Sequence, residues 1–281
     1  MLTLLPDLNI APLKYAHVHR EHGGPVHSLS YVEKELPEGK FFEAFVFLDE
    51  KNTGLKKLSF GPHGQALALD KAEAIYGAIS NAIEQWAWLA CSQSAEGAPQ
   101  ARLDLDPSPH GFAAFPGLGV QGARKRALFE AAEKWNICSW WEGKLTHVPM
   151  KMPHAIQIQT PIVGLSTVIN WTDNPRIYGI GTAPTPSLAW EKAKRNRIQN
   201  SETLKQEKTN PRILKMRYFS QRDGQARFEA RLKETGQKSS APQLLVDIQI
   251  HGPWQQYAHV WRCLFDASSF HEKDREDYFF L

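Results

Sequence analysis

The sequence predicts an α+β fold in which helices pack on mixed β-sheets. Two observations support this class. Runs rich in β-branched and aromatic residues occur in pairs separated by turn residues, and three long segments repeat apolar residues at helical spacing. The order is strand pair, helix, strand, helix, strand pair, helix, strand pair, and its first two strand–helix units are crudely similar, which suggests a pseudo-repeat. We expect one domain over residues 1–281, with an N-terminal arm (1–28), a polar excursion (205–242) and a C-terminal tail (266–281).

The first elements are a strand pair and a helix. The runs LSYVEKEL and KFFEAFVFLDE are separated by Pro37-Glu38-Gly39, which is typical of a turn. A long helix is expected over about 70–91, because apolar residues recur there at helical spacing. Asp70 and Glu73 form the pattern of a capping box at its start.

Two further helices follow the same logic. Residues 110–119 predict a short strand and a glycine-rich turn, and the segment 121–141 predicts a helix. The runs PIVGLSTVINW and IYGIGTA predict two strands, and Thr185 before Pro186 is a strong helix start, for a helix to about residue 204.

The rest of the chain is weakly patterned until it returns to strands. The excursion 205–242 is basic and polar, which predicts either a surface segment with one helix or a partly mobile segment. Two closing strands are expected in the runs LLVDIQI and YAHVWRCLF, and the tail ends in apolar residues that we expect to dock on the fold.

Composition narrows the class of protein. The 33 basic and 30 acidic residues leave a formal net charge of +3, which is too balanced to predict nucleic-acid binding. The dispersed cysteines Cys91, Cys138 and Cys263 predict buried thiols in a reducing compartment. We expect no signal peptide and no membrane span, and therefore a cytoplasmic globular protein.

Polar pairs inside the three helices are the candidate functional residues. In each pair the two residues are three positions apart, so both lie on one helix face among apolar neighbours. A solvated face is the ordinary explanation, and the alternative is that the three faces converge on one polar pocket. The pairs are Asn81/Glu84, Glu130/Glu133 and Asn196/Gln199.

Three other groups have ordinary explanations that we prefer. The histidines of HVHREH favour a strand or extended arm over a metal site. Gly61/Gly64 and Gly117/Gly119 favour tight turns over a phosphate-binding loop. The basic residues of the third helix favour a solvated face with one phosphate contact over nucleic-acid binding; they are Lys192, Lys194, Arg195 and Arg197.

Five segments in order resemble the YcaO family, and together they span roughly residues 40–265. The first two resemble the family's glycine-bearing turns with the acidic helices that follow, the third its Gly-x-Gly turn and Glu-xx-Gln helix, and the last two its closing strands. They are FGPHGQALALDKAEAIYGAISNAIEQ, HGFAAFPGLGVQGARKRALFEAAEKW, PRIYGIGTAPTPSLAWEKAKRNRIQ, LLVDIQI and YAHVWRCLF. The chain is identified as a divergent member.

The resemblance implies an enzyme that binds ATP through magnesium ions. The ATP phosphorylates a peptide-bond oxygen, and attack on the activated carbonyl gives an azoline or a thioamide in a ribosomal peptide natural product, as in thiazole and oxazole biosynthesis. It also implies a peptide substrate, a possible partner protein for leader-peptide binding, and a homodimer or hetero-oligomer. Magnesium explains the acidic residues, because it is a hard ion that prefers oxygen ligands.

Matched positions imply metal binding by Glu84, Glu130 and Glu133, and nucleotide binding by these residues with Gln199, Asn81 and Asn196. The chain departs from the family where Asn81 and Asn196 stand for acids. It departs again at positions of a family Ser or Arg: Gly77, Gln85, Lys134 and Asn200.

These departures leave an alternative of another class, a degenerate YcaO protein without ATP binding that acts as a scaffold or peptide-binding subunit. An unrelated sulfur-transfer or RNA-modification protein with an α+β fold is a third possibility.

Overall fold

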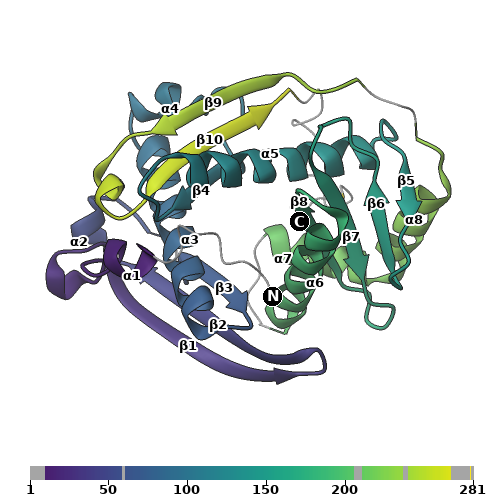
Figure 1. Ribbon diagram of the computed structural model, residues 1–281, viewed down its shortest axis with the longest axis horizontal. Coiled ribbons are helices and arrows are strands. Elements are labelled where there is room, and N and C mark those ends of the chain that lie inside the picture. Colours follow the sequence, from purple (N-terminus) through teal and green to yellow (C-terminus); the bar gives the residue numbers. More distant parts are fainter. Residues whose placement is uncertain (1–9, 59–60, 206–210, 237–239, 267–278, 280–281) are drawn as a thin grey trace. The chain divides into compact units, whose positions relative to one another are not determined.

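The computed structural model describes residues 10–58, 61–205, 211–236, 240–266 and 279 (Figure 1). Its helices and antiparallel sheets confirm the predicted α+β class. The chain divides into two compact units, Met1–Glu130 with Leu245–Leu264, and Ala131–Leu244 with Phe265–Leu281. The prediction of one domain over 1–281 stays a prediction beside this division.

The first unit contains two three-stranded sheets, in the orders β1-β2-β3 and β4-β10-β9. The strands are β1 (Val26–Leu36), β2 (Gly39–Leu48), β3 (Gly64–Ala68), β4 (Phe112–Phe115), β9 (Leu244–Ile250) and β10 (His259–Phe265). The helices and short 3-10 turns are α1 (Ala11–Lys14), η2 (Arg20–His22), α2 (Glu50–Thr53), α3 (Lys71–Ser92), α4 (Gly97–Gln100) and η3 (Pro253–Gln256). The boundary with the second unit falls within α5 (Gln121–Trp141).

Helix α3 lies along the β1-β2-β3 sheet (Figure 1). It begins as predicted, because the Asp70 side chain caps it by accepting a hydrogen bond from the Glu73 amide at 2.9 Å. Its apolar face packs on alternate residues of β2 to form the main core of this unit. The buried residues that meet there include Ala44, Val46, Leu48, Ile79, Ile83 and Trp86.

A buried cation ties β10 to the rest of the first unit. Arg262 is fully buried and donates to the backbone carbonyls of Ala101 and Asp106. Burial lowers the pKa of its guanidinium to about 10, against the opposing charge of Asp106. Since both carbonyls are bonded, this residue is a structural tie within the core.

The second unit holds one antiparallel sheet in the order β5-β6-β7-β8. Its strands are β5 (His147–Pro149), β6 (Ala155–Ile158), β7 (Ser166–Trp171) and β8 (Tyr178–Ala183), and its helices are α6 (Pro186–Leu204), α7 (Pro211–Ser220) and α8 (Arg222–Lys233). The Thr185 hydroxyl caps α6 by accepting from the Leu188 amide at 3.3 Å, as predicted. The sequence did not predict β5 and β6, which are only three and four residues long.

The excursion 205–242 forms two helices, α7 and α8, where one was expected. Its basic residues hide a regular apolar pattern, since Ile213, Met216 and Phe219 recur every three residues and are buried. On α8, buried Arg231 donates to the carbonyls of Trp140 and Leu145 and so satisfies the end of α5. Helices α7 and α8 therefore contribute to the core of the second unit.

Aromatic rings fill the centre of the second unit, and Phe279 lies among them. Phe279 is fully buried, with its ring centroid 4.9 Å from that of Phe219 and 5.1 Å from those of Tyr178 and Phe228. Its ring stacks on Trp141 at 5.3 Å. The predicted docking of the apolar tail is confirmed at this residue, and the rest of the tail beyond residue 266 lies outside the described residues.

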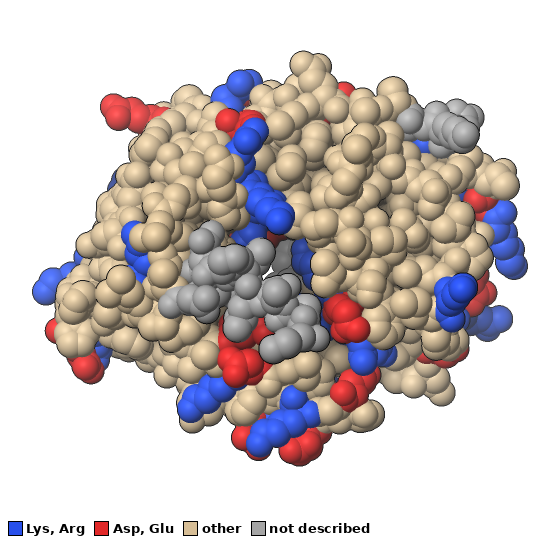
Figure 2. Space-filling model, viewed as in Figure 1, with Lys and Arg blue, Asp and Glu red and all other residues tan. Residues whose placement is uncertain are grey.

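The distribution of charged side chains on the surface agrees with the nearly equal numbers of basic and acidic residues in the sequence. Side chains of both charges are interspersed among uncharged residues on the face shown in Figure 2. Within the described residues, no helix has both the length and the apolar character needed to cross a membrane. All three cysteines are buried and unpaired with each other, as expected.

Candidate functional site

In the first unit, Asn81 is bonded to the sheet beneath α3. Its Nδ2 donates to the backbone carbonyl of Gln65 in β3 at 2.8 Å. The helix comes this close because Gly64 has no side chain, and a Cβ there would lie 2.0 Å from the carbonyl oxygen of Ala78. Asn81 therefore fixes the helix to the edge of the sheet.

Arg126 places a positive charge beside this asparagine. From α5 it donates to the Ala114 carbonyl at 2.9 Å and to Asn81 Oδ1 at 3.5 Å. Its guanidinium lies 6.0 Å from the ring centroid of Phe115, within the range of a cation–π contact. The amide oxygen of Asn81 thus faces a fixed cation.

Two carboxylates of the first unit have oxygen atoms of the kind that magnesium prefers as ligands. Glu84 is half-buried one turn beyond Asn81, and its Oε2 is shielded from solvent. Glu130 is half-buried on α5, four residues after Arg126 and hence on the same helix face. The residues of this unit fit a metal ion to that extent.

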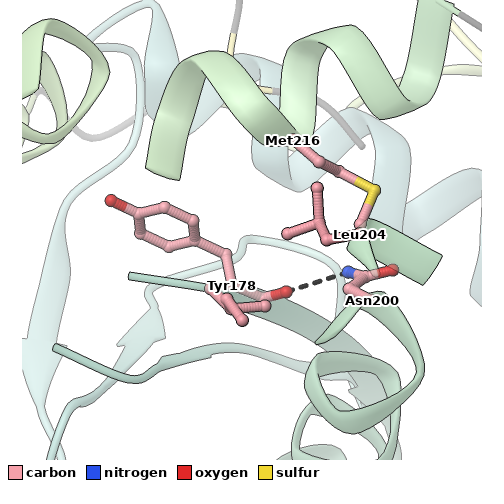
Figure 3. Close-up of a pocket in the computed structure, with 5 residues that line it drawn as sticks. Tyr178, Asn200, Leu204 and Met216 are labelled. Carbon is pink, nitrogen blue, oxygen red and sulfur yellow. Dashed lines mark hydrogen bonds between the residues drawn. The ribbon is translucent and has the colours of Figure 1, made fainter. Parts of the chain in front are cut away.

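In the second unit, the oxygen of Asn196 is taken up by two donors. Its Oδ1 accepts from the Ile180 amide of β8 at 3.1 Å and from Asn200 Nδ2 at 3.3 Å. The Asn200 amide also donates to the Tyr178 carbonyl at 2.8 Å, the hydrogen bond drawn in Figure 3. Together the two asparagines bind the edge of β8, so the Asn196 oxygen is not a fitting metal ligand.

Glu133 forms an ion pair across two helices. Its Oε2 lies 3.2 Å from Nζ of Lys192 on α6, with 22% of the glutamate side chain and 41% of the lysine side chain exposed. Lys192, Asn196 and half-buried Gln199 recur at helical spacing and share one face of α6. The charge of Glu133 is therefore balanced within its own unit.

The predicted polar pairs thus fall into separate groups, with Asn81, Glu84 and Glu130 in the first unit and Glu133, Asn196 and Gln199 in the second. Their predicted convergence on one pocket stays a prediction. Within the residues that the structure describes, no three His, Cys, Asp or Glu side chains come together as a metal site.

The glycines predicted in turns have mixed outcomes. Gly61, Gly117 and Gly119 lie in loops, as expected. The turn predicted at Gly64 is wrong, because this residue begins strand β3, where it lies against the backbone of α3. Gly179 and Gly181 lie inside strand β8, which confirms the strand predicted over IYGIGTA and contradicts the Gly-x-Gly turn that the family resemblance implied. A Cβ at either position would lie 2.4 Å or less from backbone atoms of α6, so their role is close packing.

The histidine segment and the small pocket of Figure 3 lie apart from the predicted polar pairs in sequence, except that Asn200 of the pocket bonds Asn196. HVH lies between α1 and η2, where His19 makes a single bridge to Val26, so of the two predicted alternatives, a strand or an extended arm, the strand is wrong. The pocket has an empty volume of about 160 Å³ but is too narrow for a water molecule (Figure 3). Its lining is Ile177, Tyr178, Asn200, Leu204 and Met216.

Sequence reasoning missed Arg126 and did not single out Lys192 from the four basic residues of its helix, one of which was expected to contact phosphate. Their signal was spacing, since Arg126 precedes Glu130 by four residues and Lys192 precedes Asn196 by four. The family motifs directed attention to acids.

Comparisons with known proteins identify the fold. No family model matches the chain, and no curated protein matches it in sequence. Among solved structures, YcaO from Methanopyrus kandleri bound with AMPPCP and Mg2+ is similar with a TM-score of 0.59 at 12% identity, over 98% of this chain and 94% of that one. A heterocyclase in complex with substrate and cofactor is similar with a TM-score of 0.50 at 10% identity, over 92% of this chain and about half (52%) of that one. The chain therefore has a YcaO-like fold, as its motifs predict.

Proposed function

We propose that this chain of YcaO-like fold binds ATP and takes part in the activation of peptide backbone amides. The observation that carries the proposal is a fold shared over 98% of the chain with a YcaO protein bound to AMPPCP and Mg2+. Glu84, Glu130, Glu133 and Gln199 stand at the matching motif positions and support it. A heterocyclase of similar fold in complex with substrate supports a peptide as the second ligand.

The chemistry follows from the weakness of an amide oxygen as a leaving group. Transfer of the γ-phosphoryl group of ATP to that oxygen releases ADP and converts the oxygen into part of a phosphate. A Cys, Ser or Thr side chain of the peptide, or external sulfide, then attacks the carbonyl carbon, and phosphate leaves. The product is an azoline or a thioamide in a ribosomal peptide. During phosphoryl transfer, metal ions and lysines stabilise the negative charge on the transferring phosphoryl group.

Under this proposal, Glu84 and Glu130 of the first unit hold magnesium, which supplies positive charge to the triphosphate. In the second unit Gln199 contacts the nucleotide, and Glu133 acts through its ion pair with Lys192. The protein works in the cytoplasm, as a homodimer or with a partner protein that binds the leader segment of the substrate.

Isothermal titration with ATP and magnesium tests the proposal. We expect micromolar binding that is lost in Glu84→Gln and in Glu130→Gln, because each removes a negative charge without changing side-chain size. Glu96→Gln is the matched control, since Glu96 is exposed in the same unit. An absence of binding at millimolar ATP would contradict the proposal for the isolated chain.

A second candidate is a scaffold or peptide-binding subunit that has lost ATP binding. The feature that motivates it is that both substituted asparagines have partners within the fold, since Asn81 donates to the Gln65 carbonyl and Asn196 accepts from the Ile180 amide. It predicts that the wild-type chain binds no nucleotide and that Asn81→Glu combined with Asn196→Glu creates ATP binding.

A further inference from the structure

We infer that the ammonium group of Lys192 is a built-in cation that takes the place of a metal ion at Glu133 and contacts phosphate directly. The inference rests on the proposed function, because it concerns how the second unit meets a nucleotide phosphate.

The ion pair occupies the atom that a metal ion would need. Lys192 Nζ lies 3.2 Å from Glu133 Oε2, and the two residues come from helices α6 and α5. A metal ion on this carboxylate oxygen would have to displace the ammonium. The pair also has no net charge, so little electrostatic attraction remains for a divalent cation.

The second possible metal ligand on this face of α6, the side-chain oxygen of Asn196, is already occupied by hydrogen bonds. Asn196 Oδ1 already accepts from the Ile180 amide at 3.1 Å and from Asn200 at 3.3 Å. An amide oxygen has two lone pairs, and two donors use both. A metal ion in this unit would therefore have to rely on a paired carboxylate and the neutral Gln199.

The ammonium group of Lys192 can itself donate hydrogen bonds to a nucleotide phosphate. It carries three N–H donors, of which Glu133 accepts one, and lysine is a common phosphate ligand that acts as a point charge. With 41% of its side chain exposed, Lys192 is accessible to a ligand. Glu133 would then be a positioning residue that holds the lysine in place.

The neighbouring basic residue Lys194 differs in its surroundings. Its Nζ lies 5.5 Å from the ring centroid of Trp190, in a cation–π contact. Lys194→Met thus removes a positive charge from the same helix without touching Glu133, which makes it a matched control for Lys192→Met.

The first experiment counts bound ions with Mn2+ alone, by electron paramagnetic resonance titration of the full chain. We expect Lys192→Met to bind about one more ion than the wild type, because Glu133 becomes available, and Lys192→Met/Glu133→Gln to lose it again. Lys194→Met should match the wild type. Equal ion counts in Lys192→Met and the wild type, with both folded by circular dichroism, would overturn the inference.

The second experiment measures ATP affinity in EDTA. Lys192→Met should weaken metal-free binding about tenfold, the size of one charged hydrogen bond, and Lys194→Met by less than about twofold. Equal affinities of Lys192→Met and the wild type would overturn the inference. If the wild type binds no ATP even with magnesium, the proposed function fails, and the ion count alone still decides the role of Lys192.

Discussion

Two strand–helix pairs, β3–α3 in the first unit and β8–α6 in the second, are held together by the same two devices. Each strand presents glycine to the helix backbone, Gly64 in one and Gly179 with Gly181 in the other. Each helix then bonds the strand backbone through asparagine, Asn81 in one and Asn196 in the other. This likeness relates the first and third strand–helix pairs in sequence order, whereas the pseudo-repeat was suggested for the first two.

The two pairs differ in the direction of the hydrogen bond. Asn81 donates to a carbonyl, which a carboxylate cannot do, whereas Asn196 accepts from an amide, which a carboxylate does equally well. The replacement of an acid by asparagine is therefore needed for structure only in the first unit. In the second, the companion Asn200 provides the donor.

Substitution of the glycines that contact the helix backbone should change the free energy of unfolding most. In Gly179→Ala the new Cβ would lie 2.1 Å from the Ala193 carbonyl oxygen, and in Gly64→Ala 2.0 Å from that of Ala78. Backbone atoms cannot yield cheaply, so we expect each change to lower the free energy of unfolding by about 3 kcal/mol or more, measured by urea denaturation.

Gly119→Ala is the control for both, because no atom lies within 4 Å of its Cβ position. We expect it to alter the free energy of unfolding by less than about 0.5 kcal/mol. If Gly179→Ala costs no more than Gly119→Ala, α6 is not seated on β8 and the comparison fails.

The asparagine bonds should give an intermediate effect and separate the two units. Asn81→Asp puts a carboxylate oxygen against the Gln65 carbonyl, with partial relief from Arg126, so we expect a loss of about 1–2 kcal/mol in the free energy of unfolding. Asn196→Asp keeps both hydrogen bonds and should cost less than about 0.5 kcal/mol. Equal losses in the two urea curves would remove the distinction.

The smallest expected effect is the dependence of the melting point on pH through a buried histidine. Burial, helped by the charge of Arg231, lowers the pKa of His147 below its usual 6.5, and neutral His147 accepts from Trp140 Nε1 at 3.1 Å. The unfolded chain then binds a proton that the folded chain does not, so stability present above pH 6.5 is lost as the pH falls through the folded pKa. Melting points at about pH 5 and about pH 7.5 should lie closer together in His147→Gln than in the wild type.

In the first unit, His259 is the residue that corresponds to His147. Burial, with the charge of Lys14, also lowers the pKa of His259 on β10. His259→Gln should therefore reduce the acid sensitivity as well, while exposed His22→Gln leaves it unchanged. A wild-type melting point that is the same at both pH values would show that neither histidine is linked to folding.

Local patterns predicted most of the fold. Asp70 before Glu73 and Thr185 before Pro186 located two helix starts, because capping depends on residues next to each other in sequence. Strands β5 and β6 were missed because runs of three or four residues carry too little periodicity. The apolar side of α7 was hidden because basic residues such as Lys215 and Arg217 alternate in sequence with its buried apolar residues.

The candidate site was predictable only in its residue types. Spacing placed each polar pair on one helix face, but it cannot tell whether an amide points to a ligand or to a strand. That depends on contacts between distant segments, such as Asn81 with Gln65 or Glu133 with Lys192. The same limit explains why Arg126 and Lys192 were not assigned to the site.

The pairing of β4 with β10 has a consequence for how the chain acquires its structure during synthesis. The central strand of the β4-β10-β9 sheet leaves the ribosome long after β4, and the aromatic core of the second unit waits for Phe279. Neither unit is a continuous stretch of chain, so neither can be completed while translation is still in progress at residue 244. Until then β4 has an unpaired edge and the aromatic rings lack Phe279. Both features favour aggregation and binding by chaperones.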